Sequence, residues 1–195
     1  MRQIQIERKT GETDIMIQLD LDGSGQWEIE TGVGFFDHML SHVAAHGLID
    51  LRVRAQGDLQ VDAHHTVEDV GIALGQALKQ ALGDRRGIVR YGQSLLPMDE
   101  ALALVALDFS NRGLFVGELP FASQHVGGFD TELISEFLRA LAHNAGMTLH
   151  ARLICGANTH HQIEAVFKAL GRAIRQAVAV DTKRQDAVPS TKGVL

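Results

Sequence analysis

Two short segments of the chain carry paired histidines followed by a glutamate. They read His64-His65-x-x-Glu68 and His160-His161-x-x-Glu164. Imidazole and carboxylate ligands without sulfur favour octahedral metals such as manganese or iron, with zinc as an alternative. On a helix, residues four apart share a face, whereas adjacent residues diverge by about 100°. Each motif can therefore give a histidine and a carboxylate to one metal, and we expect its two adjacent histidines to bind two different metals.

The two motifs belong to an internal repeat, whose offset is 160 − 64 = 96 residues. AHHTVEDVGIALGQALKQAL begins at Ala63, and THHQIEAVFKALGRAIRQAV begins at Thr159. Apolar residues recur in both at three- and four-residue spacing, which predicts two amphipathic helices. Asp62 and Asn158 precede the histidines and are suitable helix N-caps. The repeat predicts two related half-domains.

Further potential ligands lie on two other expected helices. His38, His42 and His46 follow one another at four-residue spacing within a helix predicted at about Phe36–Ala45, which we expect to end at Gly47. Glu136 has a comparable place in a helix predicted at about Thr131–Asn144, which we expect to end at Gly146.

Strand-like segments lie between these helices, separated by turn residues. They are Gln3–Arg8, Asp14–Asp20, Asp50–Ala55, Glu100–Asp108, Leu114–Glu118 and Met147–Leu153. The same order of strands and helices occurs twice along the chain, which predicts an α+β protein. We expect each half to be a mainly antiparallel sheet with two helices, the sheets lying on one side and the helices of the two halves packed together.

Composition excludes several classes of protein. The net charge of −6, with scattered basic residues and 5% aromatic residues, argues against a nucleic-acid partner. The longest apolar run, Ala101–Leu107, is too short to cross a membrane. The N-terminal segment does not resemble a signal peptide, and a single cysteine, Cys155, fits a reducing compartment. We therefore expect a cytoplasmic protein without a membrane partner.

Six segments together resemble the imidazoleglycerol-phosphate dehydratase family of histidine biosynthesis, over about Arg8 to Leu195. They are GFFDHMLSHVAAHGLIDL, DAHHTVEDVGIALGQAL, PMDEAL, NAGMTLHA, ANTHHQIEAVFKALGRAIRQA and PSTKGVL. The resemblance implies a lyase that dehydrates D-erythro-imidazole glycerol phosphate to imidazole acetol phosphate, with two Mn²⁺ ions per active site.

The resemblance also implies the organisation of the chain. It implies one ribosomal protein S5 domain 2-like domain over residues 1–195, with pseudo-repeats at about 1–90 and 91–182 and a substrate-binding tail at 183–195. A homo-oligomeric shell of 24 subunits, with active sites between subunits, is implied as well.

Site residues follow from the resemblance by position. The implied metal ligands are His38, His64, His65, Glu68, Glu136, His160, His161 and Glu164. Members often have histidine at the place of Glu136, where a carboxylate can serve the same metal. The implied phosphate-binding residues are Arg90, Arg112, Ser190, Thr191 and Lys192, and arginine and lysine both suit a phosphate. Glu12 matches a substrate-contacting glutamate, and we expect His38, His42 and His46 to line the substrate.

The expected reaction removes a C–H proton and a neighbouring hydroxyl, through a metal-held imidazolate and a diazafulvene-like intermediate. Glu164, Glu68 or Glu12 could move the protons, and the sequence leaves that choice open. A metallohydrolase and a non-catalytic metal-storage shell are alternatives that would use the same ligands. The implied phosphate group favours the lyase, because storage of a metal needs no phosphate clamp.

Overall fold

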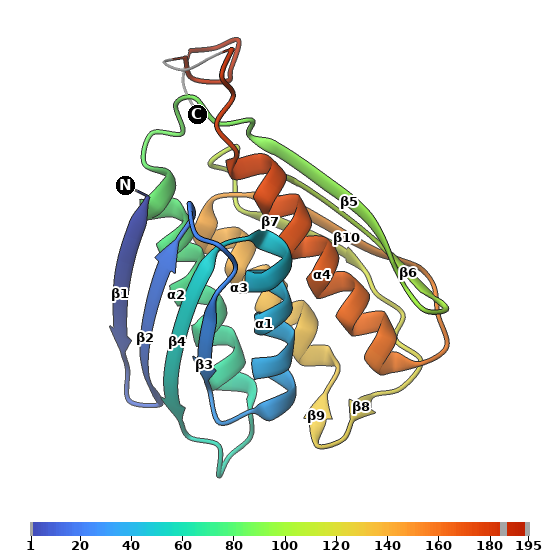
Figure 1. The fold of residues 1–195 in the computed structure, drawn as a ribbon. Coiled ribbons are helices and arrows are strands. Elements are labelled where there is room, and N and C mark those ends of the chain that lie inside the picture. Colours follow the sequence, from blue (N-terminus) through green and yellow to red (C-terminus); the bar gives the residue numbers. More distant parts are fainter. Residues whose placement is uncertain (1, 184–186, 194–195) are drawn as a thin grey trace.

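The computed structural model describes residues 2–183 and 187–193, in which two four-stranded sheets flank a middle layer of four helices (Figure 1). The first half of the chain forms β1 (Gln3–Lys9), β2 (Thr13–Asp20), β3 (Trp27–Glu30), α1 (Gly34–Gly47), β4 (Asp50–Gly57) and α2 (His64–Leu82). Its sheet has the strand order β1-β2-β4-β3, in which only β3 and β4 are parallel.

The second half of the chain repeats this topology. It forms β5 (Tyr91–Met98), β6 (Ala101–Asp108), β7 (Leu114–Glu118), β8 (His125–Val126), β9 (Phe129–Asp130), α3 (Glu132–Ala145), β10 (Thr148–Cys155) and α4 (Thr159–Val178). Its sheet has the order β5-β6-β10-β7, in which only β7 and β10 are parallel. The short hairpin of β8 and β9 is an addition to the second half.

Alternating side chains place the core between the sheets and the helices. In β2, Ile15, Ile17 and Leu19 are buried, and the residues between them face outward. The inner face of β6 is buried in the same way, as expected for sheets that are covered on one side. Helices α1 and α3 meet where the rings of Phe36 and Phe137 pack at 5.2 Å between centroids.

Helices from opposite halves pack in two pairs, α1 against α4 and α2 against α3. A glycine brings each pair close together. A Cβ on Gly171 of α4 would lie 2.8 Å from the carbonyl oxygen of Val43, and one on Gly75 of α2 would lie 2.7 Å from that of Leu141. All four helices begin at the lower end of the molecule in Figure 1, so both histidine motifs lie at that end.

The α+β fold with paired helices confirms the expectation from sequence, and the predicted helices and strands are all present. The prediction that both sheets lie on one side was wrong. The helices of each half pack on the sheet of the same half, so the two sheets lie on opposite sides of the helix layer (Figure 1). Gly47 is the last residue of α1, and Leu48 adopts the left-handed backbone, at φ 50°. The expected end at Gly146 is confirmed, at φ 60°. Strands β3, β5, β8 and β9 were not predicted.

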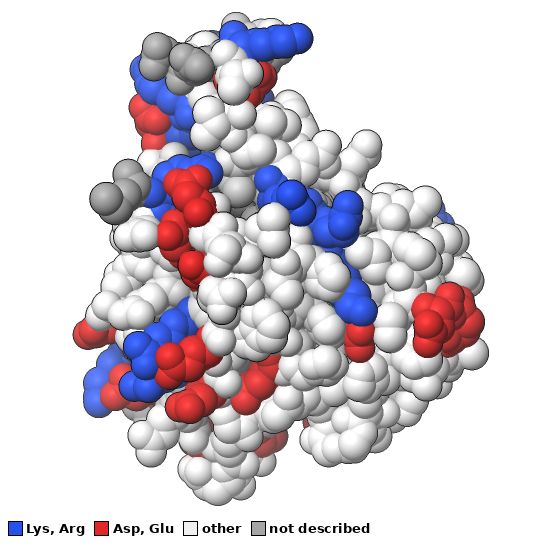
Figure 2. All heavy atoms as spheres, in the orientation of Figure 1, with Lys and Arg blue, Asp and Glu red and all other residues white. Residues whose placement is uncertain are grey.

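The surface carries charges of both signs. On the face shown in Figure 2, acidic and basic side chains are interspersed, and a short run of basic side chains lies over α4. This helix contributes Lys168, Arg172 and Arg175. Among the described residues, no helix is both long and apolar enough to cross a lipid bilayer.

Candidate metal centre

The start of α4 is fixed by the residue that precedes it. The side-chain oxygen of Asn158 accepts hydrogen bonds from the backbone N–H groups of His160, at 2.9 Å, and His161, at 3.3 Å. This N-cap satisfies two amide donors that a helix start leaves free. Both His160 and Glu164 therefore lie within the helix, where their four-residue spacing places them one turn apart on the same face.

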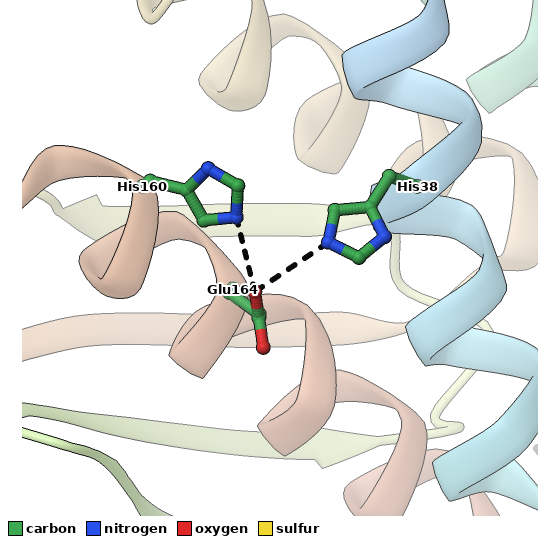
Figure 3. Close-up of side chains that lie close together, drawn as sticks. All are labelled: His38, His160 and Glu164. Atoms are coloured by element: carbon green, nitrogen blue, oxygen red, sulfur yellow. Dashed lines mark hydrogen bonds and ion pairs between the residues drawn. The ribbon is translucent and has the colours of Figure 1, made fainter.

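Three potential metal ligands converge beside this helix start (Figure 3). Nε2 of His160 lies 3.1 Å from Oε2 of Glu164, and Nε2 of His38, on α1, lies 3.5 Å from the same oxygen. The three ligand atoms lie within 4.8 Å of one another. Atoms that bind one ion at about 2.0–2.2 Å lie roughly 3–3.5 Å apart, so the cluster has the size of a metal site. Two imidazoles and a carboxylate also suit manganese and similar metals.

The carboxylate of Glu164 is ionised although its side chain is only 8% exposed. Burial by itself would raise its pKa, but the hydrogen bond from Lys168, the charges of His42 and Lys168, and a hydrogen bond from His160 lower the pKa to about 2. Lys168 Nζ lies 2.5 Å from Oε1. The cluster therefore presents a negatively charged ligand at neutral pH.

His42 lies at the edge of the cluster. Its Nε2 is 3.3 Å from that of His38 and 3.6 Å from Oε1 of Glu164. Burial lowers the pKa of His42 to about 4, and the neighbouring His38 and Lys168 act in the same direction against the opposing charge of Glu164. Its imidazole is therefore neutral at pH 7, with a lone pair that can bind a metal. His46, one turn further on, also has a lowered pKa, through burial and nearby cations.

The other histidine of each motif is held by a carboxylate. Nδ1 of His161 lies 2.8 Å from Oε2 of Glu100, and Nδ1 of His65 lies 3.0 Å from Oδ2 of Asp58. These hydrogen bonds raise the pKa of both imidazoles. Glu12 lies in the turn between β1 and β2, and its Oε1 is 3.8 Å from Nε2 of His65.

The α2 motif does not form a comparable cluster within one chain. The predicted N-cap at Asp62 was wrong, because Ala63 is the N-cap of α2 and makes no side-chain cap hydrogen bond. Asp62 lies one residue earlier and accepts a hydrogen bond from the backbone N–H of His64 at 2.7 Å. Glu136, on the neighbouring α3, forms an ion pair with Arg139 at 2.5 Å. Within residues 2–183 and 187–193, only the cluster around Glu164 brings three ligand-type side chains within 4.8 Å. The structure brings together three of the predicted ligands, His38, His160 and Glu164, and all eight ligands stay predictions. The five outside this cluster are His64, His65, Glu68, Glu136 and His161.

The predicted phosphate-binding residues gather at the other end of α4. Arg90 is buried and binds both carboxylate oxygens of Asp108, at 2.6 and 3.0 Å. Its third nitrogen donates to the carbonyl oxygen of Pro189, at 2.6 Å, which attaches the C-terminal tail. Arg112 lies 3.8 Å from the same aspartate, with an exposed side chain. In the tail, Ser190 accepts a hydrogen bond from the backbone N–H of Lys192, and Thr191 is exposed.

The length of α4 separates this basic group from the metal cluster. The backbone N–H of Arg90 donates to the carbonyl oxygen of Ala177. Ala177 follows Glu164 by thirteen residues, which corresponds to roughly 20 Å along a helix. The basic group and the metal cluster therefore lie toward opposite ends of the molecule (Figure 1).

Three residues of the site were not predicted from sequence. Lys168 follows Glu164 by four residues, so helix spacing alone could have shown their contact. Asp58 and Glu100 approach the histidines from outside the helices, 7 and 61 positions away in the chain. No helical periodicity connects such pairs.

Fold and site together define a class of protein: a duplicated α+β protein with a histidine–carboxylate centre between helices of its two halves. The model of the family "Imidazoleglycerol-phosphate dehydratase" matches residues 31–174. The chain belongs to this family, whose members are lyases of histidine biosynthesis.

Individual relatives are similar in sequence over the whole chain. The imidazoleglycerol-phosphate dehydratase of Desulforamulus reducens is 62% identical over 194 residues, covering 100% of this chain and 98% of the relative. That of Cereibacter sphaeroides strain KD131 is 58% identical, with both chains covered completely.

Two solved structures have the same fold. The imidazoleglycerol-phosphate dehydratase of Staphylococcus aureus superposes with a TM-score of 0.83 at 42% identity, covering 91% of this chain and 99% of that one. The Pyrococcus furiosus protein in complex with (S)-C348 gives 0.84 at 38% identity, with coverage of 97% and 100%.

Proposed function

We propose that this protein dehydrates D-erythro-imidazole glycerol phosphate to imidazole acetol phosphate, at a manganese site shared between chains of a homo-oligomer. The observation that carries the proposal is the convergence of His38, His160 and Glu164 on one point, in a chain of this family. The cluster would hold one Mn²⁺, and His64, His65, Glu68, Glu136 and His161 supply the remaining ligands for two ions per active site. When bound, manganese supplies charge stabilisation and orients the imidazole ring of the substrate.

The carboxylates of the site favour a division of roles in proton transfer. In the overall reaction the substrate loses one C–H proton and one hydroxyl group, which together form a water molecule. The enol that remains tautomerises to the ketone. Glu164 is a poor base, because its pKa is about 2 and its two oxygens face Lys168 and the histidines. Glu12 is more than half exposed and lies beside His65. We assign proton transfer to Glu12 and metal binding to Glu164, with Glu68 as the second candidate for the base.

The separation of the two groups supports an active site built from more than one chain. The substrate has only a three-carbon chain between its imidazole and its phosphate, which cannot span roughly 20 Å along α4. A metal cluster of one chain and a phosphate group of another, namely Arg90, Arg112, Ser190, Thr191 and Lys192, can meet in an assembly. A shell of 24 subunits is our proposal for that assembly, and metal binding would then stabilise it by linkage.

The cytoplasm as compartment, and the lack of nucleic-acid and membrane partners, stay predictions from composition. The single exposed cysteine and the interspersed surface charges support them (Figure 2).

The decisive experiment measures turnover of imidazole glycerol phosphate by metal-stripped protein, with and without added manganese. We expect restored activity alongside about two metals per chain, the stoichiometry that the two histidine motifs predict. Two bound metals without turnover would favour the hydrolase or storage alternatives. Absence of metal binding would contradict the proposal.

A further inference from the structure

The two halves of the chain hold their second histidine in the same way but with different residues. His65 and His161 occupy equivalent positions, because 161 − 65 gives the repeat offset of 96. Asp58, directly after β4, holds Nδ1 of His65, and Glu100, directly before β6, holds Nδ1 of His161. We propose that Asp58 and Glu100 are positioning residues, which fix the ring tautomer of these two histidines so that Nε2 is the metal-binding atom.

The chemistry of the contact determines the tautomer. An ionised carboxylate only accepts hydrogen bonds, so the imidazole nitrogen that faces it carries the proton. Nε2 of a neutral ring then keeps its lone pair, which is the electron pair a metal needs. Carboxylates that orient metal-binding histidines in this way typically contribute 10- to 100-fold to metal affinity. This inference rests on the proposed function, since it assumes that both rings bind manganese.

Comparison of the halves explains why different residues do this work. Glu100 is the counterpart of Glu12, because each directly precedes the second strand of its sheet. The counterpart of Asp58 is Gly156, because each directly follows the strand that leads to the histidine helix. Gly156 has φ +145°, and a Cβ there would lie 2.8 Å from Cγ of Gln162. A side chain is therefore excluded at this position.

The consequence is an exchange of roles between the halves. In the second half Glu100 must supply the carboxylate for the histidine. In the first half Asp58 supplies it, and Glu12 stays 3.8 Å from Nε2 of His65, with a side chain that is 55% exposed. Glu12 is then available to contact the substrate, as the proposed function requires.

Glu100→Gln is the sharpest test, because the surroundings dictate how the amide must lie. Oε1 of Glu100 accepts the backbone N–H groups of Ala157, at 3.1 Å, and Asn158, at 2.7 Å. The amide oxygen must keep these two donors, so its NH₂ group turns toward Nδ1 of His161. The ring then receives a hydrogen bond at Nδ1 and carries its proton on Nε2, the wrong tautomer for binding. The loop before α4 keeps both of its backbone hydrogen bonds.

Asp58 gives a contrasting pair of variants. The only side-chain partner found for Asp58 among the described residues is His65. The amide of Asp58→Asn can therefore turn its oxygen toward Nδ1 and preserve the tautomer, whereas Asp58→Ala removes the acceptor. We expect Asp58→Asn to bind manganese almost as the wild type does, and Asp58→Ala to bind it less tightly.

The experiment titrates each metal-free protein with Mn²⁺ alone and follows the paramagnetic resonance signal of the free ion. In Glu100→Gln we expect one of the two manganese sites to weaken by about 10- to 100-fold. Glu118→Gln is the control, because Glu118 is an exposed carboxylate that pairs with Arg152, and we expect wild-type affinity there. Equal affinity of Glu100→Gln and wild type would overturn the proposal.

Solid-state ¹⁵N spectra of histidine-labelled, metal-free protein give a readout that needs no metal. The spectra are recorded at a pH above the imidazole pKa that Glu100 raises, so that the ring is neutral. His161 should then carry its proton on Nδ1 in the wild type and on Nε2 in Glu100→Gln. Its signal is assigned by its loss in His161→Asn. An unchanged tautomer would contradict the inference. Failure of the wild type to bind manganese would instead contradict the proposed function, and the spectra would still decide the pairing.

Discussion

Lys168 binds one oxygen of the Glu164 carboxylate and leaves the other to His160 and His38. The distance from Nζ to Oε1 is 2.5 Å, while Oε2 faces His160 and His38. A carboxylate shared in this way is charged, oriented and unavailable as a free base. This relationship is the basis for assigning metal binding to Glu164.

Replacement of Glu164 by glutamine should remove metal and activity together. The amide is neutral, so the charge of Lys168 loses its partner within a cluster that must attract a cation. We expect turnover to fall by at least about 100-fold, because a bound metal contributes several kcal/mol of charge stabilisation and this variant loses one of its proposed ligands. Measurement of kcat and of bound manganese on the same sample checks this. Near-normal turnover with full metal content would show that Glu164 is neither ligand nor base.

Lys192→Ala should weaken substrate binding and spare the metal. Loss of one charge-assisted contact to phosphate costs about 1.5–3 kcal/mol, which corresponds to at least a tenfold rise in KM. Metal content should be unchanged, since Lys192 lies in the tail that Arg90 attaches through Pro189. Steady-state kinetics beside metal analysis distinguishes these effects. A loss of metal in this variant would place the tail within the metal site.

Gly171→Ala should destabilise the protein and displace the cluster. A Cβ at this position would lie 2.8 Å from a carbonyl oxygen and 3.0 Å from the backbone nitrogen of Gly47, and neither atom can move independently of α1. We expect a loss of about 1–3 kcal/mol in the free energy of unfolding, together with weaker manganese binding, because His38 lies on α1. Gly34→Ala is the matched control, since a Cβ there has no neighbour within 4 Å. Equal unfolding midpoints in the two variants would contradict the prediction.

Asp50 should make folding depend on pH in the acid range. Its carboxylate accepts backbone N–H groups of Gln26, Ser24 and Gly25, which lowers its pKa below the ordinary 3.8. The stabilisation is present above pH 3.8 and is lost as the pH falls through the lowered pKa. Asp50→Asn keeps an acceptor and removes the titration. The difference in urea midpoint between wild type and variant should therefore shrink below pH 3.8, and a constant difference would contradict this origin.

The sequence predicted those parts of the fold and site that depend on local spacing. The histidine helices, the cap at Asn158 and the pairing of His160 with Glu164 all follow from helical periodicity. Strand β3 was missed because it is a four-residue edge strand with two glutamates. Strand β5 was missed because it contains Gly92 and Pro97, which normally weaken a strand but are tolerated at an edge.

Other features needed the three-dimensional structure. Gly92 allows β5 to approach α4, since a Cβ there would lie 1.9 Å from the carbonyl oxygen of Ala173. The convergence of His38 with α4 depends on helix packing between the halves. The sequence repeat also suggested two equivalent metal groups, whereas a single chain assembles only the one at α4 among its described residues.

The placement of the metal cluster and the tail toward opposite ends of α4 has a genetic consequence. If each active site takes its metal ligands and its phosphate group from different chains, two impaired alleles can complement each other. A cell that expresses Glu164→Gln and Lys192→Ala together would form mixed assemblies, in which some sites combine an intact cluster with an intact tail. Extracts of such a cell should contain sites that turn over substrate with the wild-type KM, which neither allele alone provides.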